Sequence, residues 1–139
     1  MKNEKAMEEA QSLVDRTSIC MLGSIDNVGY PNIRAMIKME NEGLHTIWFS
    51  TNTSSRKISQ LRSNQKTCVY FVDLEKWIGL MLIGTIEILQ DTESRKHLWQ
   101  DGFEKYYPAG VNDPDYSVLR FTARSGKYYH ALTHATFEL

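Results

Sequence analysis

The chain has 139 residues and a formal net charge of −1 at pH 7. This length suits one domain, residues 1–139, that buries about two-thirds of the surface its unfolded chain would expose. Hydrophobic residues make up 42% and charged residues 24%, which is ordinary for a globular protein. The near-neutral charge argues against nucleic acid or an anionic membrane as a partner, because both require a basic field.

Neither a secretory signal nor a membrane span is predicted. Residues 1–10 are charged and lack the apolar segment of a signal peptide. The longest apolar run, residues 77–83, is far too short to cross a bilayer. Cys20 and Cys68 each lie in an apolar, strand-like run and are expected to be reduced core residues. A cytoplasmic protein is therefore expected.

Hydrophobic spacing predicts a mainly β fold. Residues 3–16 place apolar side chains at the spacing of an amphipathic helix. Shorter helices are expected at residues 55–63 and after Asp91, and an irregular stretch at residues 106–114. Strands separated by polar turns are expected at residues 17–25, 32–40, 44–50, 66–73, 77–89, 116–123 and 127–132. Six to seven antiparallel strands with about three short helices suggest a small closed β-barrel, because closure removes exposed sheet edges.

Alternation along residues 32–40 divides one predicted strand into two faces. The first face is apolar, and we expect it to lie in the core. The second carries two cations about 13 Å apart, which could run beside a long ligand with an anionic end. An ordinary solvated face is the alternative. The first face holds Ile33, Ala35, Ile37 and Met39, and the second holds Asn32, Arg34, Met36 and Lys38.

Residues 47–58 predict a strand that leads through a polar turn into a short helix. The turn, residues 51–55, is made of residue types that suit turns and helix caps. Arg56 and Lys57 follow in the first helical turn, where the helix dipole disfavours cations by about 0.3–1 kcal/mol each. A bound anion would offset that cost, since free N–H groups, hydroxyls and two cations together describe a phosphate site. A solvated basic turn is the alternative.

Other chemistry finds little support in the sequence. The four histidines show no zinc-type grouping, and His130 and His134 would lie roughly 13 Å apart along a strand. No metal site is therefore expected. P-loop, dinucleotide-binding and hydrolase-elbow motifs do not occur in the sequence. Tyr128 and Tyr129 are expected to pack in the core or at an interface, with contact to a ligand as the alternative.

Residues 49–57, Phe-Ser-Thr-Asn-Thr-Ser-Ser-Arg-Lys, followed by Leu61, closely resemble the flavin-phosphate motif of the pyridoxamine 5′-phosphate oxidase superfamily. Residues 31–36 are similar to the second flavin segment of that family, in which an arginine on a strand reaches the phosphate. Gly84 and residues 113–120 resemble the short bacterial branch often called general stress protein 26-like. The resemblance spans nearly the whole chain, and its central motif is specific.

The resemblance implies an FMN-binding split β-barrel, usually a homodimer with FMN at the subunit interface. The cofactor-binding residues that it implies fall into four groups: Arg34, Arg56 and Lys57 for the phosphate; Ser50, Thr51 and Ser55 as hydroxyl or backbone donors; Ala35, Met36 and Ile37 along the isoalloxazine ring; and Tyr129 as a C-terminal aromatic contact.

Several features of the full-length oxidases have no counterpart here. Met39 stands where those enzymes carry a lysine for the substrate phosphate, and Gly79 stands near a glutamine that contacts the flavin. The residues that bind pyridoxal phosphate have no clear match after Asp91. The resemblance therefore implies a flavin-binding protein that is not a competent pyridoxamine-phosphate oxidase.

The leading hypothesis is a flavin-dependent oxidoreductase that acts on an unidentified small molecule, with NAD(P)H as a candidate electron donor. A flavin carries the redox chemistry itself, so catalytic side chains need not be visible in the sequence, and none is assigned. One alternative is a non-catalytic flavin-binding stress-response protein. Another is the same barrel with deazaflavin F420 or haem, for which His130 or His134 would be the axial ligand to test. An interaction module without a cofactor is the simplest alternative.

Overall fold

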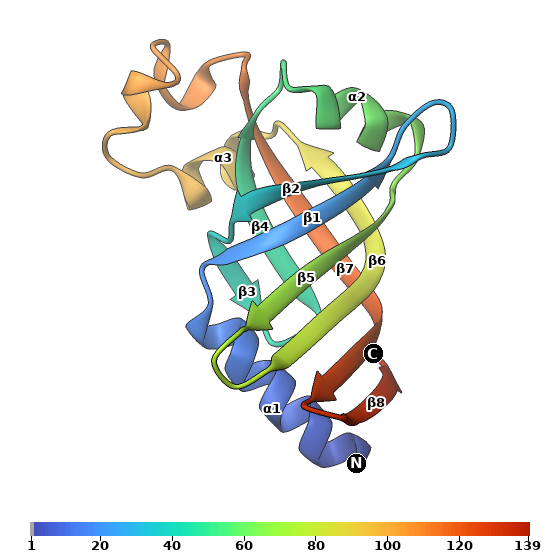
Figure 1. The fold of residues 1–139 in the computed structure, drawn as a ribbon. Coiled ribbons are helices and arrows are strands. Elements are labelled where there is room, and N and C mark those ends of the chain that lie inside the picture. Colours follow the sequence, from blue (N-terminus) through green and yellow to red (C-terminus); the bar gives the residue numbers. More distant parts are fainter. Residues whose placement is uncertain (1) are drawn as a thin grey trace.

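The computed structural model describes residues 2–139, which form three α-helices, two short 3-10 helices and one sheet (Figure 1). The helical elements are α1 (Asn3–Arg16), α2 (Arg56–Ser63), α3 (Thr92–Leu98), η1 (Phe103–Lys105) and η2 (Gly110–Asn112). The strands are β1 (Ile19–Ile25), β2 (Pro31–Ile37), β3 (Glu40–Glu42), β4 (Thr46–Asn52), β5 (Lys66–Asp73), β6 (Ile78–Leu89), β7 (Tyr116–His130) and β8 (Thr133–Glu138).

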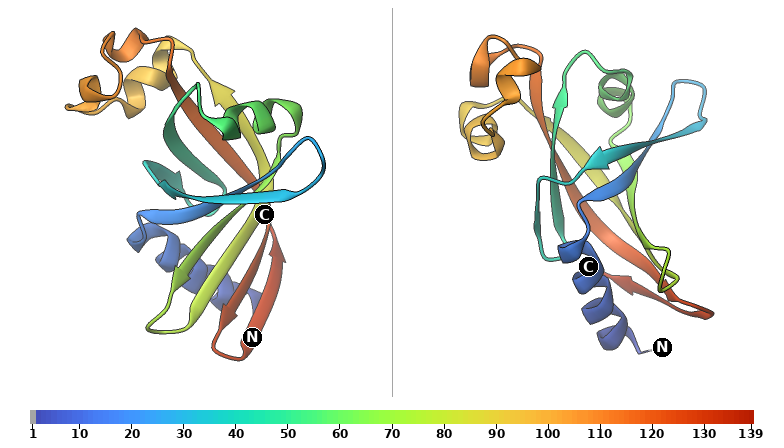
Figure 2. Two further views of the ribbon diagram at one scale, coloured as in Figure 1. Left: turned by 45° about the horizontal axis from the view of Figure 1, so that its top comes forward. Right: turned by 60° about the vertical axis from the view of Figure 1, so that its left-hand side comes forward.

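The eight strands run antiparallel in the order β2-β1-β5-β6-β7-β4-β3, with β8 paired to the end of β7. The sheet curls so that β1 and β2 cross over β4 and β7 (Figures 1 and 2). This confirms the mainly β, split-barrel fold. The sheet is a half-barrel rather than a closed barrel, because β2 continues along the chain into β3 instead of pairing with it.

The main core fills the inside of the curled sheet. Its largest fully buried side chains alternate along the central strands, as expected for strands with one face inward. They include Phe49, Phe71, Leu80, Leu82 and Phe121. Helix α1 closes one end of the half-barrel with its buried stripe of Ala6, Ala10, Leu13 and Val14, which confirms the amphipathic helix predicted at residues 3–16.

The two faces of β2 lie opposite to the expectation from the sequence. Ile33 and Ile37 are 69% and 61% exposed, whereas Arg34 is half-buried and Met36 is buried within the main core. The expectation that the apolar face would be core is wrong. The inner face of β2 meets α2 and the polar end of the half-barrel, so its polar side chains point inward and its aliphatic ones point out.

The segment with α3, η1 and η2 stands to one side of the half-barrel (Figure 2), and its residues form a second hydrophobic cluster with the start of β7. Four aromatic rings pack there with centroids 4.9–6.3 Å apart, mostly edge to face. They belong to Trp99, Phe103, Tyr107 and Tyr116. The stretch predicted to be irregular, residues 106–114, contains η2, so this part of the chain is more regular than expected.

Both cysteines are free thiols, as expected. Cys20 is buried, and burial raises its pKa to about 12. Cys68 is only partly buried, so it is not the full core residue that its apolar run suggested. Within residues 2–139, every helix is too short or too polar to span a bilayer.

Candidate functional site

The turn between β4 and α2 presents the start of a helix at the end of the half-barrel. Ser55 stands at the N-cap position in an extended conformation, but its side chain does not cap the helix. Its Oγ accepts a hydrogen bond from the Lys57 ammonium instead, over 3.1 Å. The first backbone N–H groups of α2 therefore lack a side-chain cap, and the positive end of the helix dipole stays open to an anion.

Arg34 reaches the same place from the inner face of β2. Its guanidinium donates to the Leu22 carbonyl oxygen over 3.1 Å and to Gln60 Oε1, in α2, over 3.3 Å. Gln60 Oε1 also accepts from Ser24 Oγ at 2.5 Å, so the amide oxygen joins β1, β2 and α2. These contacts hold the guanidinium against α2, one turn after its first residues.

Arg34 and Lys57 are two like charges placed together without a carboxylate. Burial lowers the pKa of Lys57, and the nearby Arg34 charge lowers it further. Burial also lowers the pKa of Arg34. Among the ion pairs of residues 2–139, none involves either side chain. This arrangement favours an anion, which would relieve the repulsion and accept hydrogen bonds from both groups.

Arg56 has different surroundings from Lys57. It is exposed, and it lines a hollow of about 400 Å³ between α2 and the turn after β1. The other residues of that hollow include Asp26, Ser59 and Gln60, and Gln60 also contacts Arg34. Adjacent helix positions differ by about 100° in direction, so Arg56 and Lys57 leave the helix in different directions.

Within residues 2–139, the hydrogen bonds of Arg34 and Lys57 do not include the two hydroxyl residues of β4. Ser50 Oγ lies 3.2 Å from the Tyr116 hydroxyl and faces the aromatic cluster. Thr51 is buried and is paired in register with Ser117 of β7. Of the predicted phosphate donors, the structure brings together Arg34, Ser55 and Lys57.

The residues expected along a flavin ring divide between two faces. Met36 points into the core, whereas Ala35 and Ile37 lie on the outer face of the sheet. Tyr129 belongs to the same outer face, where its hydroxyl lies 2.6 Å from that of Tyr70. A side chain at Gly79 would collide with the Tyr129 ring, so the ring lies flat on β6.

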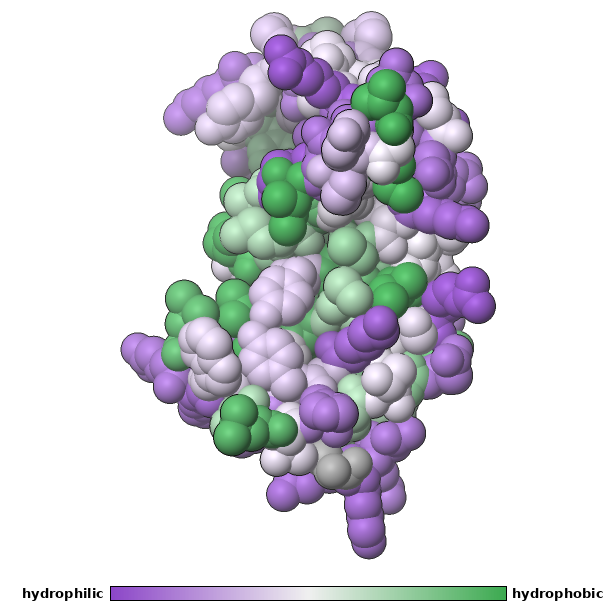
Figure 3. Space-filling model, turned by 45° about the vertical axis from the view of Figure 1, so that its right-hand side comes forward, coloured by the Kyte–Doolittle hydropathy of each residue, from purple (hydrophilic) through white to green (hydrophobic). Residues whose placement is uncertain are grey.

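The outer face of β1, β2, β5 and β6 is largely apolar. Ala35, Met21 and Tyr70 are paired in register across three strands, and Ile19 is 51% exposed beside Ile37. Figure 3 shows hydrophobic side chains gathered in the middle of the molecule, between more polar ends. Exposed apolar surface on several adjacent strands is typical of a binding or assembly surface.

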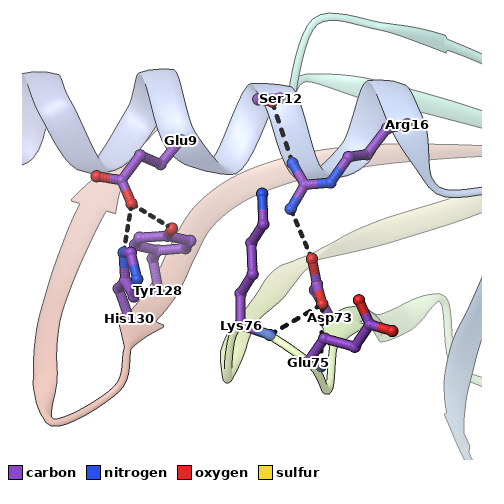
Figure 4. A network of polar contacts seen from close by, with 8 residues as sticks. All are labelled: Glu9, Ser12, Arg16, Asp73, Glu75, Lys76, Tyr128 and His130. Carbon is purple, nitrogen blue, oxygen red and sulfur yellow. Dashed lines mark hydrogen bonds and ion pairs between the residues drawn. The ribbon is translucent and has the colours of Figure 1, made fainter.

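A second polar cluster joins α1 to β7 at the opposite end of the half-barrel (Figure 4). Glu9 Oε1 accepts from the Tyr128 hydroxyl and from His130 Nδ1, each over 2.8 Å. Desolvation opposes ionisation of Glu9, but these two hydrogen bonds and the charge of His130 hold its pKa below the usual value. A hollow of about 460 Å³ adjoins the cluster, lined by Lys2, Lys5, Glu9, His130 and Thr133.

His134 does not join this cluster. His130 shares its face of the sheet with its register partner Thr133, whereas His134 pairs with Tyr129 on the other face. Successive strand residues face opposite sides, so His130 and His134 cannot converge on one ion. Within residues 2–139, no group of three or more His, Cys, Asp or Glu side chains has metal-binding geometry.

Two residues at the Arg34–Lys57 pair were not predicted from the sequence. Gln60 contacts Arg34 directly, and Ser24 holds the Gln60 side chain. The spacing of Gln60 three residues after Lys57 was a usable signal, because residues three apart share a helix face. No sequence pattern points to Ser24, because it contacts Gln60 only when β1 and α2 are packed together.

The chain was compared with known proteins. Residues 5–138 match the family model described as pyridoxamine 5′-phosphate oxidase like. A search of curated proteins found no match. Among solved structures, a Clostridium acetobutylicum protein related to general stress protein 26 of B. subtilis, of the pyridoxinephosphate oxidase family, is 49% identical; the match covers 99% of this chain and 97% of that one, with a TM-score of 0.88.

More distant structures share the fold. General stress protein 26 from Bacillus anthracis is 16% identical, with a TM-score of 0.78 over 96% of this chain and 98% of that one. A haem-binding protein from Mycobacterium smegmatis is also 16% identical, with a TM-score of 0.78 over 96% of this chain and 57% of that one. The family match over nearly all residues, together with the 49% identical relative, shows that this chain belongs to the pyridoxamine 5′-phosphate oxidase-like family.

Proposed function

We propose that this protein binds FMN, with the flavin phosphate at the start of α2. The observation that carries the proposal is the Arg34–Lys57 pair: two half-buried cations side by side, next to uncapped helix N–H groups, with lowered pKa values. A dianionic phosphate is the ligand that this set of donors suits best. Family membership supports the same ligand.

The chain's residues fit FMN in two parts. Arg34, Ser55 and Lys57 would hold the phosphate. The planar ring would then pass the free edge of β2, which among the strands of residues 2–139 pairs only with β1, and reach the apolar outer face that carries Ala35 and Tyr129. Arg56 and Ser50 would contribute less than the sequence suggested, because Arg56 is exposed and the Ser50 hydroxyl lies beside that of Tyr116.

We also propose that two copies of the chain pair through the outer face of β1 and β2. Ile19, Ile33 and Ile37 are more than half exposed there, and a second copy would cover them. FMN bound next to this face would then lie at the subunit interface, as in the homodimer that the resemblance implies.

For activity, we propose a flavin-dependent oxidoreductase with a small-molecule substrate and NAD(P)H as electron donor. The flavin supplies hydride and single-electron chemistry when bound, while the protein binds and orients it. Met39 is partly buried against the aromatic cluster, so no cation stands there to hold a substrate phosphate. This supports a substrate other than pyridoxamine phosphate.

The test is a titration of the purified protein with FMN, followed by absorption and flavin fluorescence. Tight binding of FMN and weaker binding of riboflavin, which lacks the phosphate, are expected. Bleaching of the bound flavin by NAD(P)H would support an enzyme, whereas stable FMN without bleaching would support a non-catalytic carrier. A protein that does not bind FMN at any concentration would overturn the proposal.

Haem is a second candidate, and His130 is the observation that favours it. Glu9 holds His130 through Nδ1, which leaves Nε2 free, as in many ligating histidines. Lys2 and Lys5 line the adjoining hollow and could meet propionate groups. A haemin titration with the His130→Ala variant tests this candidate, since a Soret band that persists in the variant would exclude His130 as the ligand.

The proposed compartment is the cytoplasm. Cys20 and Cys68 are both free thiols, and a reducing compartment keeps thiols in that state. Fractionation of the source cells with an antibody against the protein tests this location.

A further inference from the structure

We propose that Asp115 is a positioning residue for the phosphate site, although it touches none of the groups that would bind phosphate. Asp115 stands just before β7 and holds the turn that leads from β4 into α2. This inference rests on the proposed function, since the site it positions is the FMN phosphate site. Its experiment separates the two.

The backbone of the turn is held chiefly by Asp115. The N–H of Thr53 donates to the Asp115 carbonyl oxygen over 2.6 Å, and the N–H of Ser54 donates to Asp115 Oδ1 over 2.8 Å. The third N–H, that of Ser55, donates to the Asn52 carbonyl oxygen over 3.2 Å. Two of the three N–H groups of the turn therefore depend on one residue 61 positions away from Ser54.

A side-chain contact reinforces this attachment. Thr53 Oγ1 lies 2.6 Å from Ser117 Oγ, two residues beyond Asp115. Gln90 Nε2 bridges the same parts, since it donates to Thr53 Oγ1 over 3.3 Å and to the Pro114 carbonyl oxygen over 3.2 Å. The turn is thus attached to the start of β7 by both backbone and side chains.

Asp115 is itself held in place by Asp113, which precedes it by two residues. Its N–H donates to Asp113 Oδ1 over 2.9 Å, and Asp113 Oδ2 accepts from the N–H of Ala109 over 3.0 Å. Asp113 is buried, and Tyr116 next to Asp115 is packed in the aromatic cluster. The aromatic cluster and residues 109–115 therefore form a rigid support for the turn.

The position of the turn sets the position of the site. Ser55 follows Ser54 directly and Lys57 stands three residues after it, whereas Arg34 stands on β2 and has contacts of its own. Loss of the Asp115 bonds would free Ser55 and Lys57 from their place beside Arg34. The carboxylate charge itself opposes a nearby anion, so the contribution of Asp115 must come from its hydrogen-bond acceptors.

Two substitutions of Asp115 should have different effects on FMN binding. Asp115→Asn keeps an acceptor oxygen for the Ser54 N–H and removes the charge, so FMN should bind as well as in the wild type or better. Asp115→Ala removes the acceptor of the Ser54 N–H, while the backbone bond from Thr53 remains, and should weaken FMN by about tenfold, the scale of one charge-assisted hydrogen bond. Asp101→Ala is the matched control, because it removes an exposed carboxylate from the segment between α3 and η1.

The experiment measures FMN and riboflavin affinities of the full-length variants by flavin fluorescence. Asp115→Ala should reduce the preference for FMN over riboflavin by about tenfold and leave riboflavin binding unchanged. Equal losses for both ligands, or an unchanged preference, would overturn the inference.

If Asp115→Ala does not fold, Thr53→Val is the second variant, because it removes the contact with Ser117. It should reduce the preference for FMN about threefold. An unchanged preference in Thr53→Val would also overturn the inference. A wild-type protein without any preference for FMN would refute the proposed function instead.

Discussion

The ammonium of Lys38 lies 2.5 Å from the carbonyl oxygen of Val14, in the last turn of α1. Lys38 also donates to Asn41 Oδ1 over 2.7 Å. Lys38 follows directly after β2 and contacts the end of a helix, where a cation meets the negative end of the helix dipole. The two cations that the sequence placed on one face thus have different roles.

Lys38→Met should destabilise the protein without affecting FMN. The variant leaves the Val14 carbonyl oxygen without its charged donor, and we expect the free energy of unfolding to fall by about 1–3 kcal/mol. Thermal unfolding measures the loss, which corresponds to roughly 2–4 °C per kcal/mol for a chain of this size. Lys96→Met, on the exposed side of α3, is the control and should change nothing. Weaker FMN binding in Lys38→Met would contradict the assignment.

Lys57→Met and Arg56→Met should differ in their effect on FMN. Lys57 faces Arg34, so its loss should weaken FMN by about 10- to 100-fold, as expected for a charge-assisted contact. Arg56 is exposed, and its loss should cost less than threefold. Isothermal titration with FMN compares the two. A larger effect from Arg56 would show that the phosphate is held by Arg56 rather than by Lys57.

The lowered pKa of Lys57 predicts a pH dependence of stability in the ligand-free protein. An unfolded chain holds the Lys57 proton up to about the ordinary value of 10.5, whereas the folded protein releases it earlier. The unfolded state then binds more protons, so raising the pH toward 10.5 should increase the stability of the wild type relative to Lys57→Met. Urea unfolding of both proteins between pH 8 and pH 10 measures this difference. A difference that stays constant would mean that Lys57 is not strained by burial or by Arg34.

The proposed pairing of two chains predicts that a charge on the outer face will separate them. Ile33→Lys would place an ammonium in the covered surface, and we expect dimer affinity to fall at least tenfold, because an unpaired buried charge is costly. Val28→Lys is the control, since Val28 is 74% exposed in the turn between β1 and β2. Light scattering after size-exclusion chromatography gives the mass. A wild-type protein that is monomeric at all concentrations would refute the pairing.

Local sequence patterns were sufficient to predict the helices and strands that have a clear hydrophobic periodicity. Residues 3–16 were predicted as a helix and form α1, and residues 55–63 differ from α2 by one position. Residues 116–123 and 127–132 were predicted as two strands but form one, β7. Arg124-Ser125-Gly126 looked like a break, yet Gly126 is needed because a Cβ there would lie 2.5 Å from the ring of Phe137 in β8. That requirement exists only once β8 has folded back.

Orientation was the part that the sequence could not provide. Alternation in β2 gives two faces, but which face points inward depends on what covers each face, and α2 covers the polar one. Likewise, the motif around Arg56 and Lys57 names two cations, while the packing of Ile58 and Leu61 decides which of them turns toward Arg34. The attachment of the β4–α2 turn to Asp115 depends on residues far apart in sequence, and no periodic pattern signals it.

Glu9 has a consequence for how the chain is made. Its partners, Tyr128 and His130, stand 119 and 121 residues later, so α1 is synthesised well before the residues that fix Glu9. A nascent chain still on the ribosome cannot form these two contacts until the end of β7 has emerged. Truncation near residue 125 should therefore leave this part of α1 without its contacts to β7, so the α1–β7 end of the half-barrel is completed late in folding.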